Sequence, residues 1–205
     1  DAILDIKEFI FKKYDESSPS NFDLNQKYFL SIGRLSKQKN FTYLIEEFKL
    51  FKDETSNKDI KLLLIGNGEE KNKLINKIKY YGLTNEIKLI ERTENVYKFM
   101  RKCEAFILPS LWEEVGFVIV EAALSNSPII SSDCPNGPSE FLDSGKSGIL
   151  FKNNEYRELS NKLKLFVNDQ ENQIKKRKYT KLNCKKYTKF RHYQIFNNLI
   201  NENKI

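Results

Sequence analysis

The chain has 205 residues, of which 40% are hydrophobic, and its formal net charge is +7 at pH 7. This apolar content excludes an intrinsically disordered protein, and the length allows one large α/β domain to bury a sizeable core. The sequence shows no secretory leader and no apolar run near the ~20 residues of a membrane-spanning helix, so we expect a soluble protein of the cytoplasm. Three widely spaced cysteines argue against a disulfide framework and against a zinc site.

Short apolar segments alternate with segments of helical spacing along most of the chain. Strands are predicted at residues 27–33, 60–66, 86–91, 105–109, 127–132 and 147–151. The clearest helical stripe follows the first strand and consists of Phe41, Leu44, Ile45, Phe48 and Phe51. Further helices are predicted near residues 74–78, 95–102, 159–166 and within 171–205. This alternation predicts an α/β fold, a Rossmann-like parallel sheet of six strands with helices on both faces.

The segment 116–126 has conflicting local preferences. Phe117 to Val120 favour a strand, whereas Glu121 to Leu124 favour a helix. Two parallel strands that end near residue 109 and begin near residue 128 need a crossover of a dozen or more residues, usually a helix. We therefore predict a buried helix over 116–126 that begins near Gly116.

The loop after the first strand carries two cations. Gly33 permits a backbone conformation that other residues avoid. Arg34 and Lys39 follow it at the carboxyl edge of the predicted sheet, where a forked guanidinium and a compact ammonium suit a diphosphate. Because the chain contains no Asp-x-Asp pair, we expect this diphosphate site to hold no metal.

Two glutamates flank the start of the predicted crossover helix. Glu113 falls in the loop after the fourth strand and Glu121 in the helix, at the edge where open α/β sheets bind ligands. A carboxylate there suits the hydroxyls of a ribose, and the helix amino end suits phosphate. Alternatively, Glu113 and Glu114 only favour the helix amino end electrostatically. These residues alone leave both interpretations open.

Four motifs occur in a fixed order: GRLSKQKN (33–40), LLLIGNGEE (62–70), AFILPSLWEE (105–114) and GFVIVEAAL (116–124). In these motifs the sequence resembles the carboxyl-terminal domain of retaining glycosyltransferases with the GT-B fold, glycosyltransferase family four, over roughly residues 27–170. The resemblance implies one half of a GT-B fold and transfer of a sugar, with retention, from a nucleotide-diphosphate donor to an acceptor. It further implies a hexosyltransferase that needs no cofactor and that assembles bacterial surface polysaccharide or lipopolysaccharide.

The resemblance also implies residue roles. In the family's E-x7-E pair, Glu113 would lie beside the transferred sugar and Glu121 would bind the ribose hydroxyls. Arg34 and Lys39 would hold the diphosphate, and backbone N–H groups at the start of the helix would face the sugar and phosphates. The implied catalytic residues are Glu113, Arg34 and Lys39. The implied donor-binding residues are these three together with Gly33, Gly116, Phe117, Val118 and Glu121.

The implied organisation has three parts. Residues 1–26 form a polar segment or linker, 27–170 a nucleotide-sugar-binding domain, and 171–205 basic helices that pack on the domain or leave it. A whole GT-B enzyme also needs an amino-terminal domain that binds the acceptor, and residues 1–26 are too short to form one. We therefore expect that domain to be absent here and the isolated chain to be inactive.

Residues 175–191 carry nine basic and no acidic side chains. Interleaved aromatic residues suggest nucleic acid as one partner, and anionic membrane headgroups at the inner face of the membrane are another. We favour a solvated helix face and do not expect nucleic acid as a partner. A non-catalytic module that binds a nucleotide-sugar or nucleic acid is the alternative function.

Trp112 directly precedes the first glutamate of the pair. We expect its indole to pack beneath the Glu113 loop and not to stack on a substrate.

Overall fold

The computed structural model describes residues 12, 14, 15, 22–91, 93, 95–113 and 116–202. These residues form one sheet of six parallel strands in the order β3-β2-β1-β4-β5-β6. The strands are β1 (Tyr28–Ile32), β2 (Lys61–Ile65), β3 (Ile87–Ile90), β4 (Ala105–Leu108), β5 (Ile129–Ser132) and β6 (Ile149–Phe151). Each predicted strand is confirmed, with ends that differ by at most two residues. The chain reverses its direction of travel across the sheet between β1 and β4, which is the topological switch point of a Rossmann-like fold.

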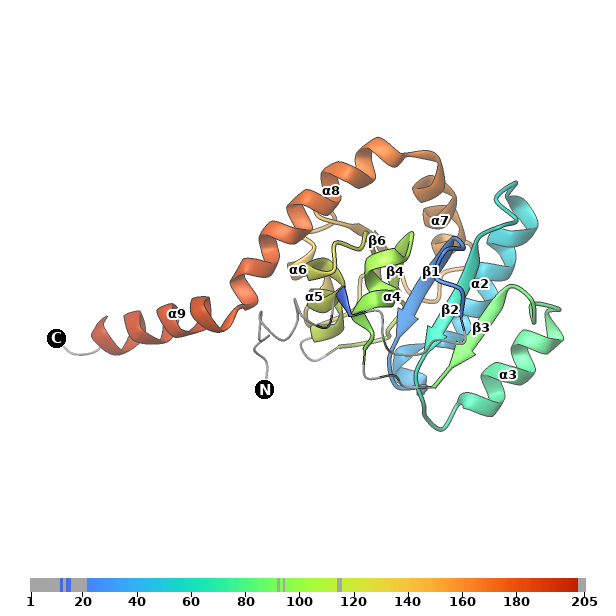
Figure 1. Cartoon of the computed structure of the whole chain (residues 1–205), viewed down its shortest axis with the longest axis horizontal. Coiled ribbons are helices and arrows are strands. Elements are labelled where there is room, and N and C mark those ends of the chain that lie inside the picture. Colours follow the sequence, from blue (N-terminus) through green and yellow to red (C-terminus); the bar gives the residue numbers. More distant parts are fainter. Residues whose placement is uncertain are drawn as a thin grey trace.

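Helices cover both faces of the sheet, as predicted (Figure 1). One face packs against α2 (Phe41–Glu54), α3 (Lys71–Tyr80) and α7 (Glu158–Asn168). The other face packs against α4 (Tyr97–Lys102), α5 (Phe117–Leu124) and α6 (Pro138–Phe141). Side chains alternate between the faces along each strand, so that Phe29 lies on the α2 side and Leu30 on the α5 side. Both faces are thus buried, as expected for a fully parallel sheet.

The apolar stripe of α2 is buried along its whole length. All five of its predicted members are at most 1% exposed. The helix follows the short 3-10 helix η1 (Lys37–Lys39) and Asn40, which has a left-handed backbone with φ 54°. The Asn40 amide donates to the side-chain oxygens of Asn153 and Asn154, each at 3.0 Å. These bonds tie the start of α2 to the loop after β6.

The ambiguous crossover segment is helical. Gly116, with φ 60° and ψ 42°, precedes α5, whose residues Ile119, Val120, Ala122 and Ala123 are buried. The connection between two parallel neighbouring strands therefore decides the conformation, and the strand propensity of residues 117–120 is overridden.

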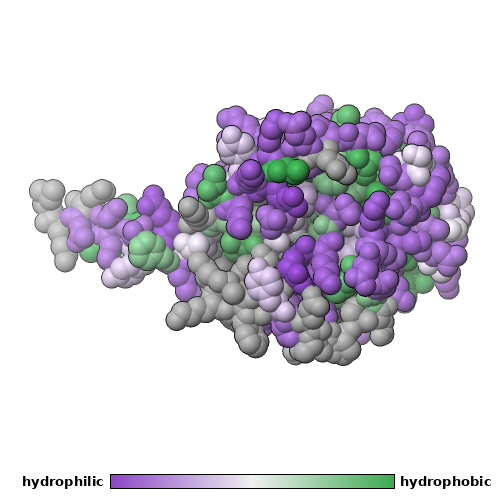
Figure 2. All heavy atoms as spheres, turned by 45° about the horizontal axis from the view of Figure 1, so that its top comes forward, coloured by the Kyte–Doolittle hydropathy of each residue, from purple (hydrophilic) through white to green (hydrophobic). Residues whose placement is uncertain are grey.

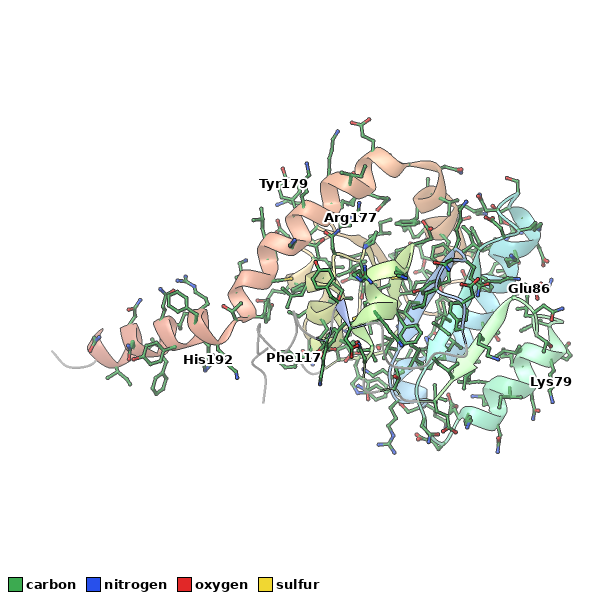
Figure 3. All side chains as sticks on the ribbon, viewed as in Figure 1. Lys79, Glu86, Phe117, Arg177, Tyr179 and His192 are labelled. Atoms are coloured by element: carbon green, nitrogen blue, oxygen red, sulfur yellow. The ribbon has the colours of Figure 1, made fainter. Side chains whose placement is uncertain are left out.

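The end of the chain divides into a packed part and a projecting part. Helix α8 (Gln170–Asn183) crosses back over the domain, where the Asn183 amide donates to the Phe141 carbonyl and to the Ser147 hydroxyl, both at 3.0 Å. Figure 3 shows Arg177 directed from α8 toward the body of the domain and Tyr179 directed outward. After the 3-10 helix η2 (Cys184–Tyr187), α9 (Lys189–Glu202) projects away from the domain with apolar side chains exposed (Figures 1 and 2). No helix in the described part of the chain combines the length and the apolar character that crossing a membrane requires.

Candidate functional site

Two loops meet at the switch point between β1 and β4. The Leu111 N–H donates to the Gln38 carbonyl at 2.8 Å, and the Gln38 side-chain amide donates to the Trp112 carbonyl at 3.0 Å. The loop after β1 and the loop after β4 are therefore fixed to one another through Gln38. This arrangement holds the motifs of both loops at the carboxyl edge of the sheet, where such folds bind ligands.

Lys39 and Glu113 form a largely buried ion pair at this edge. Their Nζ and Oε1 atoms are 2.6 Å apart, and the side chains are 17% and 5% exposed. The structure thus brings together two of the residues that the sequence singled out. Because removal of one partner from a buried pair leaves an uncompensated charge, each residue holds the other in place.

Gly33 does not use the conformational freedom that glycine permits. It is not among the described glycines with positive φ. A Cβ on Gly33 would meet only the flexible Lys39 side chain, at 3.4 Å, whereas a Cβ on Gly66 would lie 1.9 Å from the Gly33 carbonyl oxygen. A backbone bond of 2.9 Å from Leu35 N–H to the Asn67 carbonyl joins the same two loops. The absence of a side chain at Gly66 lets the loops after β1 and β2 touch.

A cleft with a volume of about 590 Å³ opens beside these loops. Gly33, Arg34, Tyr97 and Glu121 are among the residues that line it. This volume lies within the range of about 300–1,000 Å³ that small-molecule sites occupy. The structure therefore places three of the predicted donor-binding residues, Gly33, Arg34 and Glu121, around one cleft.

Glu121 is held by a residue that the sequence did not reveal. The Tyr97 hydroxyl donates to Glu121 Oε1 at 3.2 Å. Burial raises the pKa of the Glu121 carboxyl, and the hydrogen bond from Tyr97 lowers it in part. Tyr97 begins α4 and lies outside the four motifs, a short distance before the motif at 105–114, and the packing of α4 against α5 brings it to Glu121.

Arg34 remains open to solvent at the mouth of the cleft. Its side chain is 75% exposed, and its Nε lies 3.4 Å from Oε2 of Glu69, which is itself 59% exposed. An exposed pair of this kind contributes little to stability. The guanidinium is therefore able to exchange Glu69 for an anionic ligand at little cost.

The amino end of α5 lies against Glu113. A Cβ on Gly116 would be 3.6 Å from Glu113 Cγ, and no described side chain caps the helix. Phe117 and Val118 are half-buried in its first turn, where Figure 3 shows Phe117. No described side chain accepts a hydrogen bond from the first-turn N–H groups of Phe117 and Val118, and a helix amino end of this kind favours an anion.

Trp112 does not pack beneath the loop. Its side chain is 49% exposed, which contradicts the expectation. Glu113 takes the buried position by pairing with Lys39, and the neighbouring side chain is left facing solvent.

Comparison with known proteins agrees with this architecture. The family model of "Glycosyl transferases group 1" matches residues 12–186. An uncharacterized glycosyltransferase of Methanocaldococcus jannaschii is 40% identical over 114 residues, which cover 56% of this chain and 28% of the relative. A Campylobacter jejuni enzyme, N-acetylgalactosamine-N,N'-diacetylbacillosaminyl-diphospho-undecaprenol 4-alpha-N-acetylgalactosaminyltransferase, is 30% identical over 146 residues, which cover 71% of this chain and 39% of the relative.

A solved structure shows the same fold. The crystal structure of Anabaena HepE in complex with UDP superposes with a TM-score of 0.76 at 22% identity, covering 86% of this chain and 49% of that one. The chain therefore spans less than half of each of these three proteins. With its six-stranded parallel sheet and the family match over most of its length, the chain belongs to the group 1 glycosyl transferases and has the Rossmann-like architecture of a GT-B domain.

Proposed function

We propose that this chain is the donor-binding half of a retaining glycosyltransferase of family four, which transfers a hexose from a nucleotide-diphosphate sugar. The cleft at the carboxyl edge of the sheet carries this proposal, because Arg34 and Glu121 both line it. The UDP named in the HepE structure supports a nucleotide ligand for a domain of this fold.

The donor lies across the cleft in a defined direction. Glu121, positioned by Tyr97, accepts hydrogen bonds from the ribose hydroxyls. The diphosphate lies between Arg34, Lys39 and the amino end of α5, including the N–H groups of Gly116, Phe117 and Val118. The transferred sugar then reaches the buried Glu113. Glu113 and Glu121 thus act as the two members of an E-x7-E pair.

The proposed chemistry is a front-face displacement without a protein nucleophile. The bond from the anomeric carbon to the diphosphate oxygen breaks as the acceptor hydroxyl oxygen approaches from the same face. The acceptor proton passes to the departing diphosphate. Arg34 and Lys39 stabilise the negative charge that develops there, and transfer accordingly needs no metal. Glu113 is partly neutralised by Lys39, so it suits orienting sugar hydroxyls and stabilising positive charge better than attacking the sugar.

The acceptor is bound by a second domain outside this chain. The coverage of 28% and 39% of the two relatives supports this division. The diphospho-undecaprenol in the name of the Campylobacter relative supports a role in assembling bacterial surface saccharides on a lipid carrier. Such an enzyme works in the cytoplasm at the inner face of the membrane, where the basic residues 175–191 are suited to anionic headgroups.

Calorimetric titration of the chain with UDP, GDP and ADP tests this function. We expect at least one diphosphate to bind more tightly than its parent nucleoside, because Arg34 and Lys39 recognise the phosphates. Arg34→Ala should weaken diphosphate binding and leave nucleoside binding unchanged, and Lys49→Ala, which removes a partly exposed lysine of α2 outside the cleft, serves as the control. Equal affinities for nucleoside and diphosphate, or no binding of any nucleotide, would overturn the proposal.

A further inference from the structure

A second cleft adjoins the donor cleft on the far side of Arg34. Its volume is about 560 Å³, and its lining includes Arg34, Lys37, Gln38, Glu69 and Trp112. Arg34 is common to both clefts. If the donor lies as proposed, its diphosphate is at Arg34 and its nucleoside lies away from this second cleft. The second cleft therefore opens toward the reacting end of the donor.

Trp112 presents its indole to this cleft from a fixed backbone. The carbonyl of Trp112 accepts from Gln38 at 3.0 Å, the preceding residue is bonded to the Gln38 carbonyl at 2.8 Å, and the following residue is Glu113 in its buried ion pair. The side chain is nevertheless 49% exposed. A large aromatic surface left in water on a rigid loop is typical of a binding site, because burying it later is favourable and costs little further ordering.

The charges of the cleft are nearly balanced. With Arg34 engaged by the diphosphate, two basic residues, Lys37 and Lys73, and two acidic residues, Glu69 and Glu70, remain in the lining of the cleft. Lys73 pairs with Glu70 at 2.7 Å. Lys37 is exposed and adds one further donor. A cleft with paired charges does not select a polyanion, but it offers donors and acceptors to a neutral ligand rich in hydroxyl groups. One aromatic plane surrounded by such groups matches a sugar ring, whose C–H face packs on the negative face of an aromatic ring.

We propose that this cleft binds a sugar ring of the acceptor saccharide, with Trp112 as the stacking surface. The proposal rests on the donor-binding function and adds an acceptor subsite to this half of the enzyme. Because Trp112 directly precedes Glu113, a ring stacked on the indole lies next to the transferred sugar. Trp112 is then a residue that determines acceptor specificity and takes no part in the bond changes.

Trp112 is the only tryptophan of the chain, so its fluorescence reports on this cleft alone. We would titrate the chain, with and without UDP, with methyl glycosides and disaccharides of glucose, galactose, N-acetylglucosamine and N-acetylgalactosamine. At least one saccharide should change the emission with a saturable dependence on concentration. Absence of any saturable change in a chain that still binds a nucleoside diphosphate would overturn the subsite and leave the donor function standing.

Variants separate stacking from a structural role. In saturation-transfer NMR, Trp112→Ala should lower the affinity for the saccharide about tenfold, whereas Trp112→Phe should retain most of the affinity. Tyr80→Ala, which removes an aromatic ring that is 84% exposed at the end of α3, should change nothing and is the matched control. Diphosphate affinity should be equal in all three variants. Undiminished saccharide binding by Trp112→Ala would refute the proposal and leave Trp112 as a contact for the acceptor-binding domain. Saccharide binding without any nucleotide binding would instead refute the donor function.

Discussion

Burial raises the pKa of the Glu121 carboxyl, and this has opposite effects on stability and on binding. Stability from a group with a raised folded-state pKa is fully present below its unfolded pKa and is lost as the pH rises through the folded value. At pH 7, well above the pKa of a glutamate in the unfolded chain, burial of the Glu121 carboxyl therefore destabilises the free domain. Ligand hydroxyls that donate to it restore hydrogen bonds that burial removed.

Glu121→Gln should accordingly leave the melting temperature at pH 7 unchanged or raise it. The same change should weaken nucleoside diphosphate binding about tenfold or more, since charge-assisted hydrogen bonds contribute ~1.5–3 kcal/mol. Calorimetric titration and differential scanning calorimetry of one preparation measure both effects. A lower melting temperature with unaltered affinity would identify Glu121 as a structural residue.

Glu113→Gln should separate the two glutamates. We expect nucleoside diphosphate affinity to be nearly unchanged, because the proposed partner of Glu113 is the sugar and Lys39 remains available to the phosphates. Turnover of the full-length enzyme should fall about 100-fold, the order found when one preorganised electrostatic group is lost. Equal losses of diphosphate affinity in Glu113→Gln and Glu121→Gln would contradict this division of roles.

Sequence patterns predicted which residues lie at the candidate site better than they predicted which other residues those would contact. Arg34, Lys39, Glu113 and Glu121 follow from motifs in two loops and one helix, whereas Tyr97 depends on how α4 packs against α5. The orientation of Trp112 depends on which of two neighbouring side chains takes the buried position. Contacts of this kind are set by tertiary packing, which local spacing does not encode.

At the scale of helices and strands, the crossover connections that a parallel sheet requires predicted secondary structure better than local propensity did. The stripe of α2 and the crossover requirement for α5 predicted both helices, even though residues 117–120 favour a strand. The contact between the loops after β1 and β2 was not predictable in the same way. Glycine at positions 33 and 66 indicates conformational freedom or close approach equally well, and only the three-dimensional arrangement distinguishes them.

Gly66→Ala tests this close approach. The added Cβ would lie 1.9 Å from the Gly33 carbonyl oxygen, so one loop must move. We expect a loss of about 3 kcal/mol or more in the free energy of unfolding, at the upper end for overpacking. Gly82→Ala is the matched control: it has φ +67° and no atom within 4 Å of the added Cβ, so it should cost only ~1 kcal/mol. Denaturant unfolding measures both, and similar losses would show that the loops adjust to the added Cβ and that their close approach does not require glycine at position 66.

The two terminal helices should differ in their contribution to stability. Truncation after Thr188 removes α9, whose residues Phe190, Tyr193 and Phe196 are already more than half exposed, and should lower the melting temperature by no more than about 4 °C. Truncation after Asp169 removes α8 and η2 as well, including the buried Cys184 and the bonds of Asn183, and should destabilise far more. Equal melting temperatures of the two truncated proteins would show that α8 does not stabilise the domain.

At the scale of the whole molecule, the described domain carries the proposed donor cleft on an edge that is open to solvent. Charges that develop during transfer are stabilised best in a site from which water is excluded, and Arg34, exposed at 75%, is not yet in such a site. A second domain that covers this edge would exclude water and bring the acceptor hydroxyl to the sugar. We therefore expect the described domain to be sufficient for donor binding and the second domain to be needed as well for sugar transfer.

The isolated chain should bind a nucleoside diphosphate weakly and transfer no sugar to an added acceptor. Incubation with a radiolabelled nucleotide-sugar and a saccharide acceptor, followed by separation of product, measures transfer directly. The full-length enzyme, assayed under the same conditions, is the positive control, and its Glu113→Gln variant gives the background. Because a domain that binds donor without closing over it leaves the anomeric carbon accessible to water, slow hydrolysis of the donor by the chain is compatible with this view. Stoichiometric transfer by the 205-residue chain alone would show that the reacting centre is complete within one domain.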